Sequence, residues 1–177
     1  MRVISGIARG RKLTAPEGLD TRPTTDNVKE SLFNIIQFDI EGRKVLDLFA
    51  GSGQLGIECL SRGAASAVFV DERREAVKTV NENLNKCGFS AEVFLTDAVS
   101  YLHRCGKFDI IFIDPPYDSD YYEIVMKTIN LFDILNKGGI IIVESRSDKI
   151  LDSMQEPYHP VKEYVYGSVK LSLFSHY

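Results

Sequence analysis

The sequence predicts a doubly wound α/β fold, with a mostly parallel seven-stranded sheet that ends in an antiparallel hairpin. Three observations predict it. From residue 44 onward, short apolar runs alternate with segments of helical periodicity. The runs are almost continuously apolar, as in FDIIFI and GGIIIV, which is typical of parallel strands covered on both faces. Near the end of the chain, apolar and polar residues alternate on both sides of Gly167-Ser168, which indicates a hairpin.

The first 43 residues are expected to form a basic extension to the main domain, which covers residues 44–177. RVISG and RKLTAP flank IARG and predict a small hairpin or an extended arm. DTRPTTDN reads as a polar loop, in which Thr24 or Thr25 is available to cap the next helix. That helix is predicted over residues 26–37, from the helical spacing of Val28, Leu32, Ile35 and Ile36.

The main domain is expected to alternate strands with helices. Its five parallel strands are predicted at KVLDLF, AVFVDE, AEVFLTD, FDIIFIDPP and GGIIIVES. Helices are predicted over residues 54–62, 73–87, 98–104 and 120–135, with a last short helix near 147–154. The segments PVKEYVYG and VKLSLFSHY supply the two strands of the hairpin.

Composition indicates a soluble globular protein. The 177 residues are 44% hydrophobic and 26% charged, and the longest apolar runs are only strand-sized. MRVISGIARGRK lacks the apolar region of a secretory signal, so we expect a cytoplasmic protein without membrane contact. We also expect a monomer. The spacing of the three cysteines fits neither a metal site nor a disulfide framework, and we expect reduced thiols at Cys59, Cys87 and Cys105.

Charge is unevenly distributed along the chain. The formal net charge of −4 argues against wholesale nucleic-acid binding. The basic residues are nevertheless concentrated at the N-terminus, where the first 22 residues include Arg2, Arg9, Arg11, Lys12 and Arg22. Such an arm can contact phosphates, although a short basic run is more often only solvated surface.

Acidic residues lie within or at the ends of the predicted strands, at the edge where the carboxyl ends of the strands meet. A single aspartate at such a place is commonly a helix cap or a turn residue. Several on one edge of an open α/β sheet indicate a ligand that donates several hydrogen bonds. The residues concerned are Asp47, Asp71, Glu72, Asp97 and Asp114.

The glycine loop after the first strand fits two classes of cofactor. Gly51, Gly53 and Gly56 form the pattern G-x-G-x-x-G, and Asp71 follows Gly51 by twenty residues. This matches a nicotinamide dinucleotide site, and it suits S-adenosylmethionine (SAM) equally well. A pyrophosphate needs no nearby anion, whereas the cationic amino group and sulfonium of SAM favour one, and Asp47 lies four residues before the loop.

Three acidic positions suit the parts of SAM. Asp47 is placed either to supply negative charge or to orient the loop through its backbone N–H groups. Asp71 can accept hydrogen bonds from both ribose hydroxyls. Asp97 can accept one from the adenine amino group, with the backbone N–H of Ala98 directed at the ring.

The DPPY sequence after the fourth strand favours SAM over a dinucleotide. Prolines lack N–H donors, so the carbonyls at Pro115 and Pro116 are released from sheet pairing. Asp114 and the Pro115 carbonyl can then accept from one exocyclic amino group and hold it toward a methyl donor. Tyr117 offers a ring against which an unstacked base can lie.

Over nearly its full length the chain resembles the bacterial RsmD-type enzymes, which methylate a guanine N2 in small-subunit ribosomal RNA. The motifs that carry the resemblance are ISGIARGRKLTAP, TRPTTDNVKESLFNI, VLDLFAGSGQLGIE, DPPY and the late YG at Tyr166-Gly167. The resemblance implies a Rossmann-like class I SAM-dependent methyltransferase. Gln54 departs from the pattern, because relatives usually have a small residue there.

The resemblance also assigns residues to sites. It implies a SAM site that contains Asp47, Phe49, Gly51, Gly53, Asp71, Glu72, Asp97 and Ala98. The target amine and base would be held by Asp114, Pro115, Pro116 and Tyr117. Ribosomal RNA, free or within an assembling small subunit, would contact Arg9, Arg11, Lys12, Arg22 and Thr24.

The expected reaction is direct in-line methyl transfer to the N2 amine of an extruded guanine, without a metal. Three alternatives remain open. The first is another amine methyltransferase, acting on adenine N6 or on a glutamine amide, although Asp rather than Asn at position 114 disfavours the amide. The second is a non-catalytic module that binds SAM or RNA, and the third is an NAD-dependent oxidoreductase.

Overall fold

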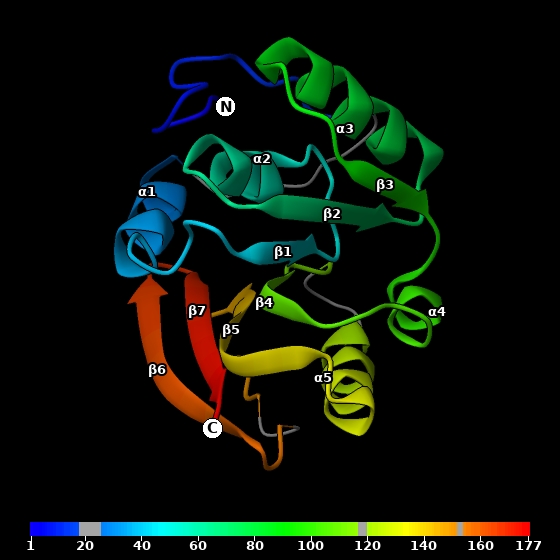
Figure 1. Cartoon of the computed structure of the whole chain (residues 1–177). Helices are drawn as coiled ribbons and strands as arrows, with labels where there is room; N and C mark the ends of the chain where they lie inside the picture. The colour runs from blue at the N-terminus through cyan, green and yellow to red at the C-terminus, as the bar shows by residue number, and fades with distance from the viewer. Residues whose placement is uncertain (18–25, 117–119, 152–153) are drawn as a thin grey trace.

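The computed structural model describes residues 1–17, 26–116, 120–151 and 154–177. They contain seven strands: β1 (Lys44–Asp47), β2 (Ser66–Asp71), β3 (Glu92–Leu95), β4 (Phe108–Ile113), β5 (Leu135–Arg146), β6 (Tyr158–Tyr166) and β7 (Val169–His176). One sheet holds all seven in the order β3-β2-β1-β4-β5-β7-β6 (Figure 1). β1 to β5 pair in parallel, whereas β7 lies antiparallel between β5 and β6. The predicted seven-stranded fold is confirmed.

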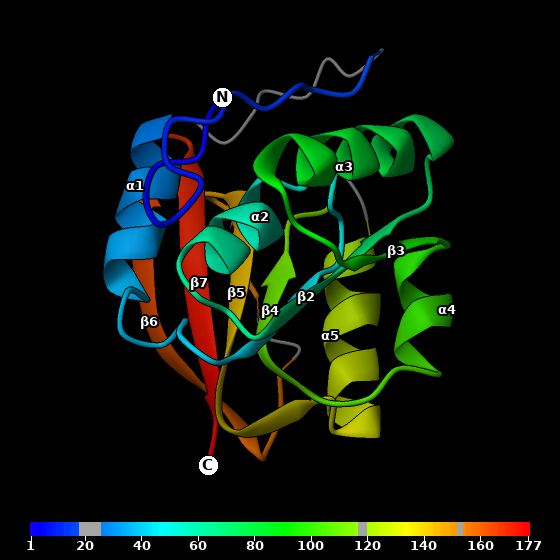
Figure 2. The ribbon, with the colours of Figure 1, turned by 45° about the horizontal axis from the view of Figure 1, so that its top comes forward.

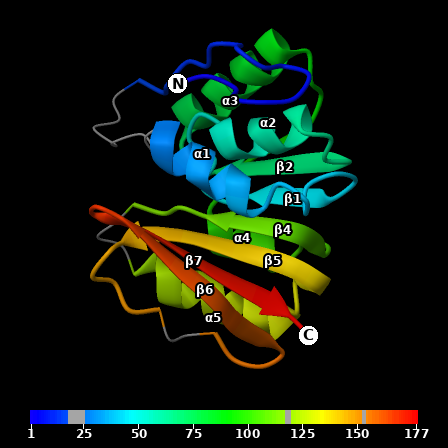
Figure 3. The same cartoon turned by 90° about the vertical axis from the view of Figure 1, so that its left-hand side faces the viewer.

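Helices cover both faces of the sheet. Their bounds are α1 (Asp26–Ile35), α2 (Gln54–Ser61), α3 (Arg74–Cys87), α4 (Ala98–Leu102) and α5 (Tyr121–Phe132). The first three pack on one face and the last two on the other (Figures 1 and 3). No helix among the described residues is both long enough and apolar enough to cross a membrane.

The strands alternate their side chains between the two halves of the core. In β4, Ile110 and Phe112 belong to the cluster under α1, α2 and α3, whereas Ile111 and Ile113 belong to the cluster against α4 and α5. A strand buried on both faces needs apolar residues at every position, which explains the continuous run in its sequence.

Each helix and strand lies close to its predicted position, with two differences. β5 begins at Leu135, so it includes Leu135, Asn136 and Lys137 ahead of the glycine pair with which the predicted strand began. The helix expected near residues 147–154 is wrong for the residues described there, which form a turn and an irregular segment. Ile150 is 80% exposed, whereas Leu151 and Met154 pack partly buried against the core cluster of α4 and α5 without a helix.

The N-terminal arm is a minimal hairpin. Arg2 and Lys12 form an isolated antiparallel bridge, and the Val3 N–H donates to the Arg11 carbonyl at 2.9 Å. Val3, Ala8 and Leu13 are buried in the same core cluster as α1, α2 and α3. The arm continues across α3 (Figure 2), where the Asn83 side chain exchanges two hydrogen bonds of 2.9 Å with the backbone of Thr14.

A buried carboxylate fastens this arm to the main domain. Glu58 on α2 accepts the N–H groups of Ile4 and Ser5 at 2.8 and 2.9 Å. Lys29 is also fully buried, and its Nζ lies 3.1 Å from Glu58 and 3.0 Å from the Arg2 carbonyl. Because each buried charge has a partner, the arrangement avoids the cost of an isolated ion in the core.

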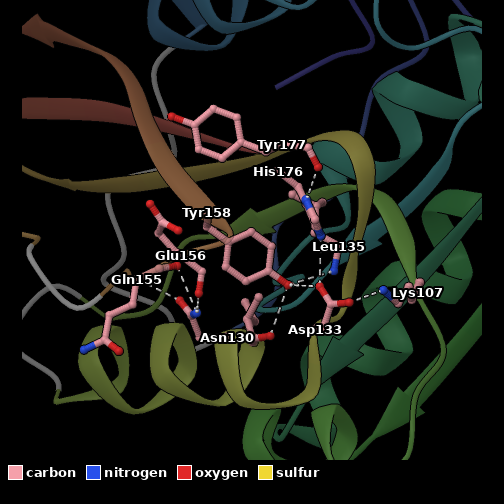
Figure 4. A network of polar contacts seen from close by, with 10 residues as sticks. Lys107, Asn130, Asp133, Leu135, Gln155, Glu156, Tyr158, His176 and Tyr177 are labelled. Atoms are coloured by element: carbon pink, nitrogen blue, oxygen red, sulfur yellow. Dashed lines mark hydrogen bonds and ion pairs between the residues drawn. The ribbon is translucent and has the colours of Figure 1, made fainter.

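A polar network fastens the hairpin of β6 and β7 to the C-terminal end of α5 (Figure 4). Asp133, which follows α5, accepts the Tyr158 hydroxyl at 3.0 Å and lies 3.1 Å from His176 Nε2. It also pairs with Lys107. Asn130 on α5 donates to the Gln155 carbonyl at 3.0 Å and accepts its N–H at 2.9 Å. The last strands are thus held by side chains as well as by sheet pairing.

Candidate active site

The strand order reverses beside β1, which places a cavity at the carboxyl ends of the parallel strands. From β1 the chain continues to β2 and β3 on one side, and β4 and β5 follow on the other. Ligands of open α/β sheets bind at such a switch point. The cavity there measures about 850 Å³, and pockets for small molecules and cofactors commonly measure about 300–1,000 Å³. It is lined from all five parallel strands or the loops after them, through Asp47, Asp71, Thr96, Asp114 and Glu144.

The first and third glycines of the loop have different physical roles. Gly51 has a φ of +56° and lines the cavity, and a Cβ placed on it would meet no protein atom within 4 Å. A ligand can therefore approach the backbone at Gly51 closely. A Cβ on Gly56 would lie 2.4 Å from Cε1 of Phe69 in β2. Gly56 is required because α2 packs tightly on the sheet.

Asp47 orients the loop from beneath. Its side chain is 2% exposed, and Oδ2 accepts the Gly56 N–H at 3.0 Å. Burial raises the pKa of Asp47 to about 7, although the Gly56 hydrogen bond lowers it, and the charge of Asp71 adds to the increase. Of the two roles expected for Asp47, the structure shows the contact with a backbone N–H of the loop helix.

Asp71 holds the other side of the loop. The Gly51 N–H donates to its Oδ2 at 2.9 Å, and the Arg73 N–H donates to its Oδ1 at 2.9 Å. The Arg73 guanidinium adds contacts of 3.1 and 3.2 Å. A carboxylate has about four acceptor positions, so these four donors occupy it. Ribose hydroxyls at Asp71 would have to replace contacts of Arg73, whose side chain is 41% exposed.

An aromatic wall lies beside Asp71. The rings of Phe49 and Tyr121 have centroids 5.5 Å apart, and the Tyr121 hydroxyl donates to Glu72 at 3.3 Å. The charge of Glu72 raises the pKa of Tyr121. All three side chains line the cavity, which gives a planar ring a surface to contact.

Asp97 is the N-cap of α4. Its Oδ1 accepts the Ser100 N–H at 2.9 Å, and hydrogen bonds from Ser100 lower the pKa of Asp97. The neighbouring Ala98 lines the cavity, but Asp97 and Gly53 are not among the lining residues. The adenine contact expected of Asp97 stays a prediction.

The residues after β4 reach the cavity from the side opposite Asp71. Asp114, Pro115 and Pro116 all line it. Enclosure by protein raises the pKa of Asp114 well above its usual range, and the negative charges of Glu144 and Asp47 raise it further. Tyr117 lies outside the described residues, so its expected stacking role stays a prediction.

The N-terminal arm reaches the cavity through residues on either side of its hairpin, and its basic residues are not among those that line it. Arg9, Arg11 and Lys12 are exposed, and Met1, Ala15 and Pro16 from the same segment line the cavity. Arg22 and Thr24, the other residues expected to contact RNA, lie outside the described residues.

Glu144 and Gln54 are two of the cavity residues to which the sequence assigned no role. Glu144 is only 4% exposed and lines the cavity from the end of β5. The sequence signal that could have identified Glu144 is an acidic residue at the end of an apolar strand, which is also the position of Asp114. Gln54 begins α2, and its Oε1 is buried without a hydrogen-bond partner. Within the described ranges, no cluster of three or more His, Cys, Asp or Glu side chains is arranged to hold a metal ion.

Comparison with known proteins extends the resemblance found in the sequence. Residues 1–175 match the family model described as conserved hypothetical protein 95. The chain is 45% identical to Bacillus subtilis YlbH over 150 residues, covering 81% of this chain and 82% of that one. It is 38% identical to ribosomal RNA small subunit methyltransferase D of Escherichia coli over 180 residues, covering 98% and 89%. The solved structure of E. coli yhhF superposes with a TM-score of 0.88 at 34% identity, covering 99% and 97%.

Proposed function

The chain belongs to the RsmD family, described by the conserved hypothetical protein 95 model, and we propose that it methylates small-subunit ribosomal RNA at a guanine N2. One observation carries the proposal. The glycine loop at Gly51 and the Asp114-Pro115-Pro116 segment line the same cavity, from β1 and β4 on the two sides of the switch point. A methyl donor on the loop and an amine at Asp114 would therefore meet inside one enclosed site.

The cavity fits SAM as the methyl donor. Gly51 leaves room for close backbone approach, Asp71 fixes the loop, and Phe49 with Tyr121 forms an aromatic wall. Asp47 provides a carboxyl in the part of the cavity where the cationic end of SAM would lie. When bound, SAM supplies an electrophilic methyl group.

Asp114 and Pro115 would position the amine. An amino group conjugated to a purine is a weak nucleophile, so orientation and exclusion of water must account for much of the rate. The Asp114 carboxyl and the Pro115 carbonyl can accept its two hydrogens and direct the nitrogen toward the glycine loop. Because the pKa of Asp114 is raised, its carboxylate is also suited to take up the proton that the amine releases.

The exposed basic residues of the arm would bind the RNA backbone. Arg9, Arg11 and Lys12 lie on a hairpin whose following residues line the cavity, so phosphates bound there would lead a nucleotide toward Asp114. The remaining surface carries net negative charge, so ribosomal proteins of an assembling subunit would help to present the RNA. A ribosomal RNA substrate implies that the protein acts in the cytoplasm.

Labelled SAM tests the proposal. We would incubate the protein separately with naked ribosomal RNA, small subunits from a source that lacks the modification, DNA, and protein, and then digest the products to nucleosides. We expect label in N2-methylguanosine from the RNA or the subunits. Label in N6-methyladenine, or in no nucleic acid, would refute the proposal and favour one of the alternatives.

A further inference from the structure

Three carboxyl groups form a row across the sheet beneath the cavity. Asp47, Asp114 and Glu144 lie at the ends of β1, β4 and β5, which are neighbours in the sheet. Because side chains alternate between the two faces of a sheet along each strand, all three carboxyl groups lie on the same face. Val45 in β1, Phe112 in β4 and Ile142 in β5 belong to the core cluster beneath α1, α2 and α3, and each row residue follows one of them by two positions.

Within this row, Asp114 and Glu144 lie at the same level. Ile113 pairs with Val143 in the parallel register of β4 and β5, so the next residues on the two strands are direct neighbours. Adjacent strands lie about 4.8 Å apart, so two side chains on the same face there come within reach of one ligand. The charge of Glu144 acts on Asp114, which agrees with this proximity.

The position of Glu144 is rigid. The hydroxyl of Tyr122, which is buried, donates to the Glu144 carbonyl at 3.1 Å. Antiparallel pairing with Leu171 of β7 fixes the other side of the strand. Apolar side chains surround the two carboxyls beneath the cavity floor, including Leu32, Leu55 and Leu171. In such surroundings a polar ligand atom that fails to match the carboxyls is strongly disfavoured.

Strand order also determines on which side of Asp114 each ligand lies. The proposed SAM residues follow β1, β2 and β3, whereas Glu144 follows β5 on the opposite side of β4. A base whose amine points from Asp114 toward the methyl donor must extend its remaining edge away from β1. One of the two ring positions next to the amine then faces Glu144, and a carboxylate there favours the position that carries a hydrogen.

The two purines differ at that ring atom. In guanine, N1 carries a hydrogen next to the N2 amine, so the edge presents two adjacent donors. In adenine, N1 next to the N6 amine carries a lone pair. We propose that Glu144 selects guanine, by accepting the N1 hydrogen while Asp114 accepts from the N2 amine. An adenine would place its N1 lone pair against an oxygen of Glu144. This inference rests on the proposed function and adds the residue that chooses the base.

The test changes the base and the residue together. After the methylated guanine has been mapped with the wild-type protein, that position of the RNA is replaced by 2-aminopurine. This base keeps the 2-amino group but has a lone pair at N1. The wild type should prefer guanine in kcat/KM by at least about 100-fold, because a site that binds an N–H rejects the analogue that lacks it. Glu144→Gln can donate to the lone pair, and should reduce this preference at least tenfold.

Matched variants separate selection from folding. Glu123→Gln makes the same change at an exposed residue that pairs with Lys127, and should keep the wild-type preference. SAM affinity and thermal unfolding would verify that Glu144→Gln is folded. If it is not, Glu144→Asp keeps the carboxylate at shorter reach, and should lower kcat on guanine while the preference for guanine remains.

The outcomes are distinct. A reduced preference in Glu144→Gln supports the inference. Equal losses on both bases, or an unchanged preference, would overturn it while guanine methylation by the wild type still upheld the proposed function. If the wild type labelled no guanine N2, both would be refuted.

Discussion

The carboxylate of Asp71 accepts the Gly51 N–H at 2.9 Å, so the end of β2 holds the loop that follows β1. Asp71 therefore stabilises the open glycine backbone that a cofactor would contact, in addition to any direct contact with the ribose.

Replacing Asp71 should weaken cofactor binding. Asp71→Ala removes the acceptor for Gly51, and a hydrogen bond to a charged group contributes about 1.5–3 kcal/mol. We expect the Kd for SAM, measured by titration calorimetry, to rise by about 10- to 100-fold. Arg73→Ala is the control, because it removes the guanidinium and leaves the Gly51 bond, and it should change the Kd much less. Equal effects of the two changes would contradict this role of the loop.

Replacing Asp114 should have the opposite pattern. Asp114→Ala removes the proposed acceptor for the amine without touching the glycine loop. Methyl transfer from labelled SAM should fall below detection, while the Kd for SAM stays within about threefold of wild type, since less than about 1 kcal/mol of its binding depends on this carboxyl. A large rise in the Kd would mean that Asp114 belongs to the cofactor site.

Asp47 should make the protein less stable as the pH rises from about 4 to about 7. Its pKa is raised to about 7 in the folded state, so the folded protein binds more protons than the unfolded chain in this range. The stabilisation is complete below the unfolded pKa and is lost as the pH rises through the folded one. The maximal slope is about 1.4 kcal/mol per pH unit. Asp47→Asn keeps an oxygen for the Gly56 N–H and removes the titration.

The measurement is the free energy of unfolding in urea at several pH values. Stability of the wild type relative to Asp47→Asn should decrease from pH 4 to pH 7. Parallel curves for the two proteins would show that Asp47 is ionised at a normal pKa in the fold.

The third glycine should tolerate no side chain. Gly56→Ala places a methyl group 2.4 Å from the Phe69 ring, and should cost about 1–3 kcal/mol of unfolding free energy. Gly88→Ala is the matched control, because a Cβ there meets nothing within 4 Å and only its φ of +75° is unfavourable. Phe69→Leu should rescue Gly56→Ala and not Gly88→Ala. Additive effects of Gly56→Ala and Phe69→Leu would refute the close contact.

The sequence predicted the sheet and its helices because the spacing of apolar residues along the chain shows which face of each element is buried. The continuous run FDIIFI, buried on both faces, could hardly be anything but a central parallel strand. The segment near residues 147–154 was predicted wrongly because its few apolar residues allowed a helical interpretation. In the structure the Ser147 N–H donates to the Ser168 carbonyl at 2.9 Å. The start of the segment therefore extends the hydrogen bonding between β5 and β7 and does not begin a helix.

The candidate site was predicted less completely, since side-chain orientation is decided by neighbours. Nothing in the sequence indicates that the Arg73 side chain folds back onto Asp71, or that the Asp97 carboxylate accepts the Ser100 N–H. Glu144 was overlooked because, within an apolar strand, it resembled the end of a core element. Only the pairing of β4 with β5 places it beside Asp114.

The position of β7 imposes an order on biosynthesis. β5 and β6 leave the ribosome before β7, yet β7 lies between them in the finished sheet. Until residues 169–176 have emerged, β5 exposes an unpaired edge, and such edges promote aggregation of nascent chains. Glu144 faces Leu171 across that edge, so the floor of the proposed base site is completed only by the last strand. A chain stalled before β7 would have the glycine loop but no finished pocket, and the enzyme would become active only after translation of its sheet is complete.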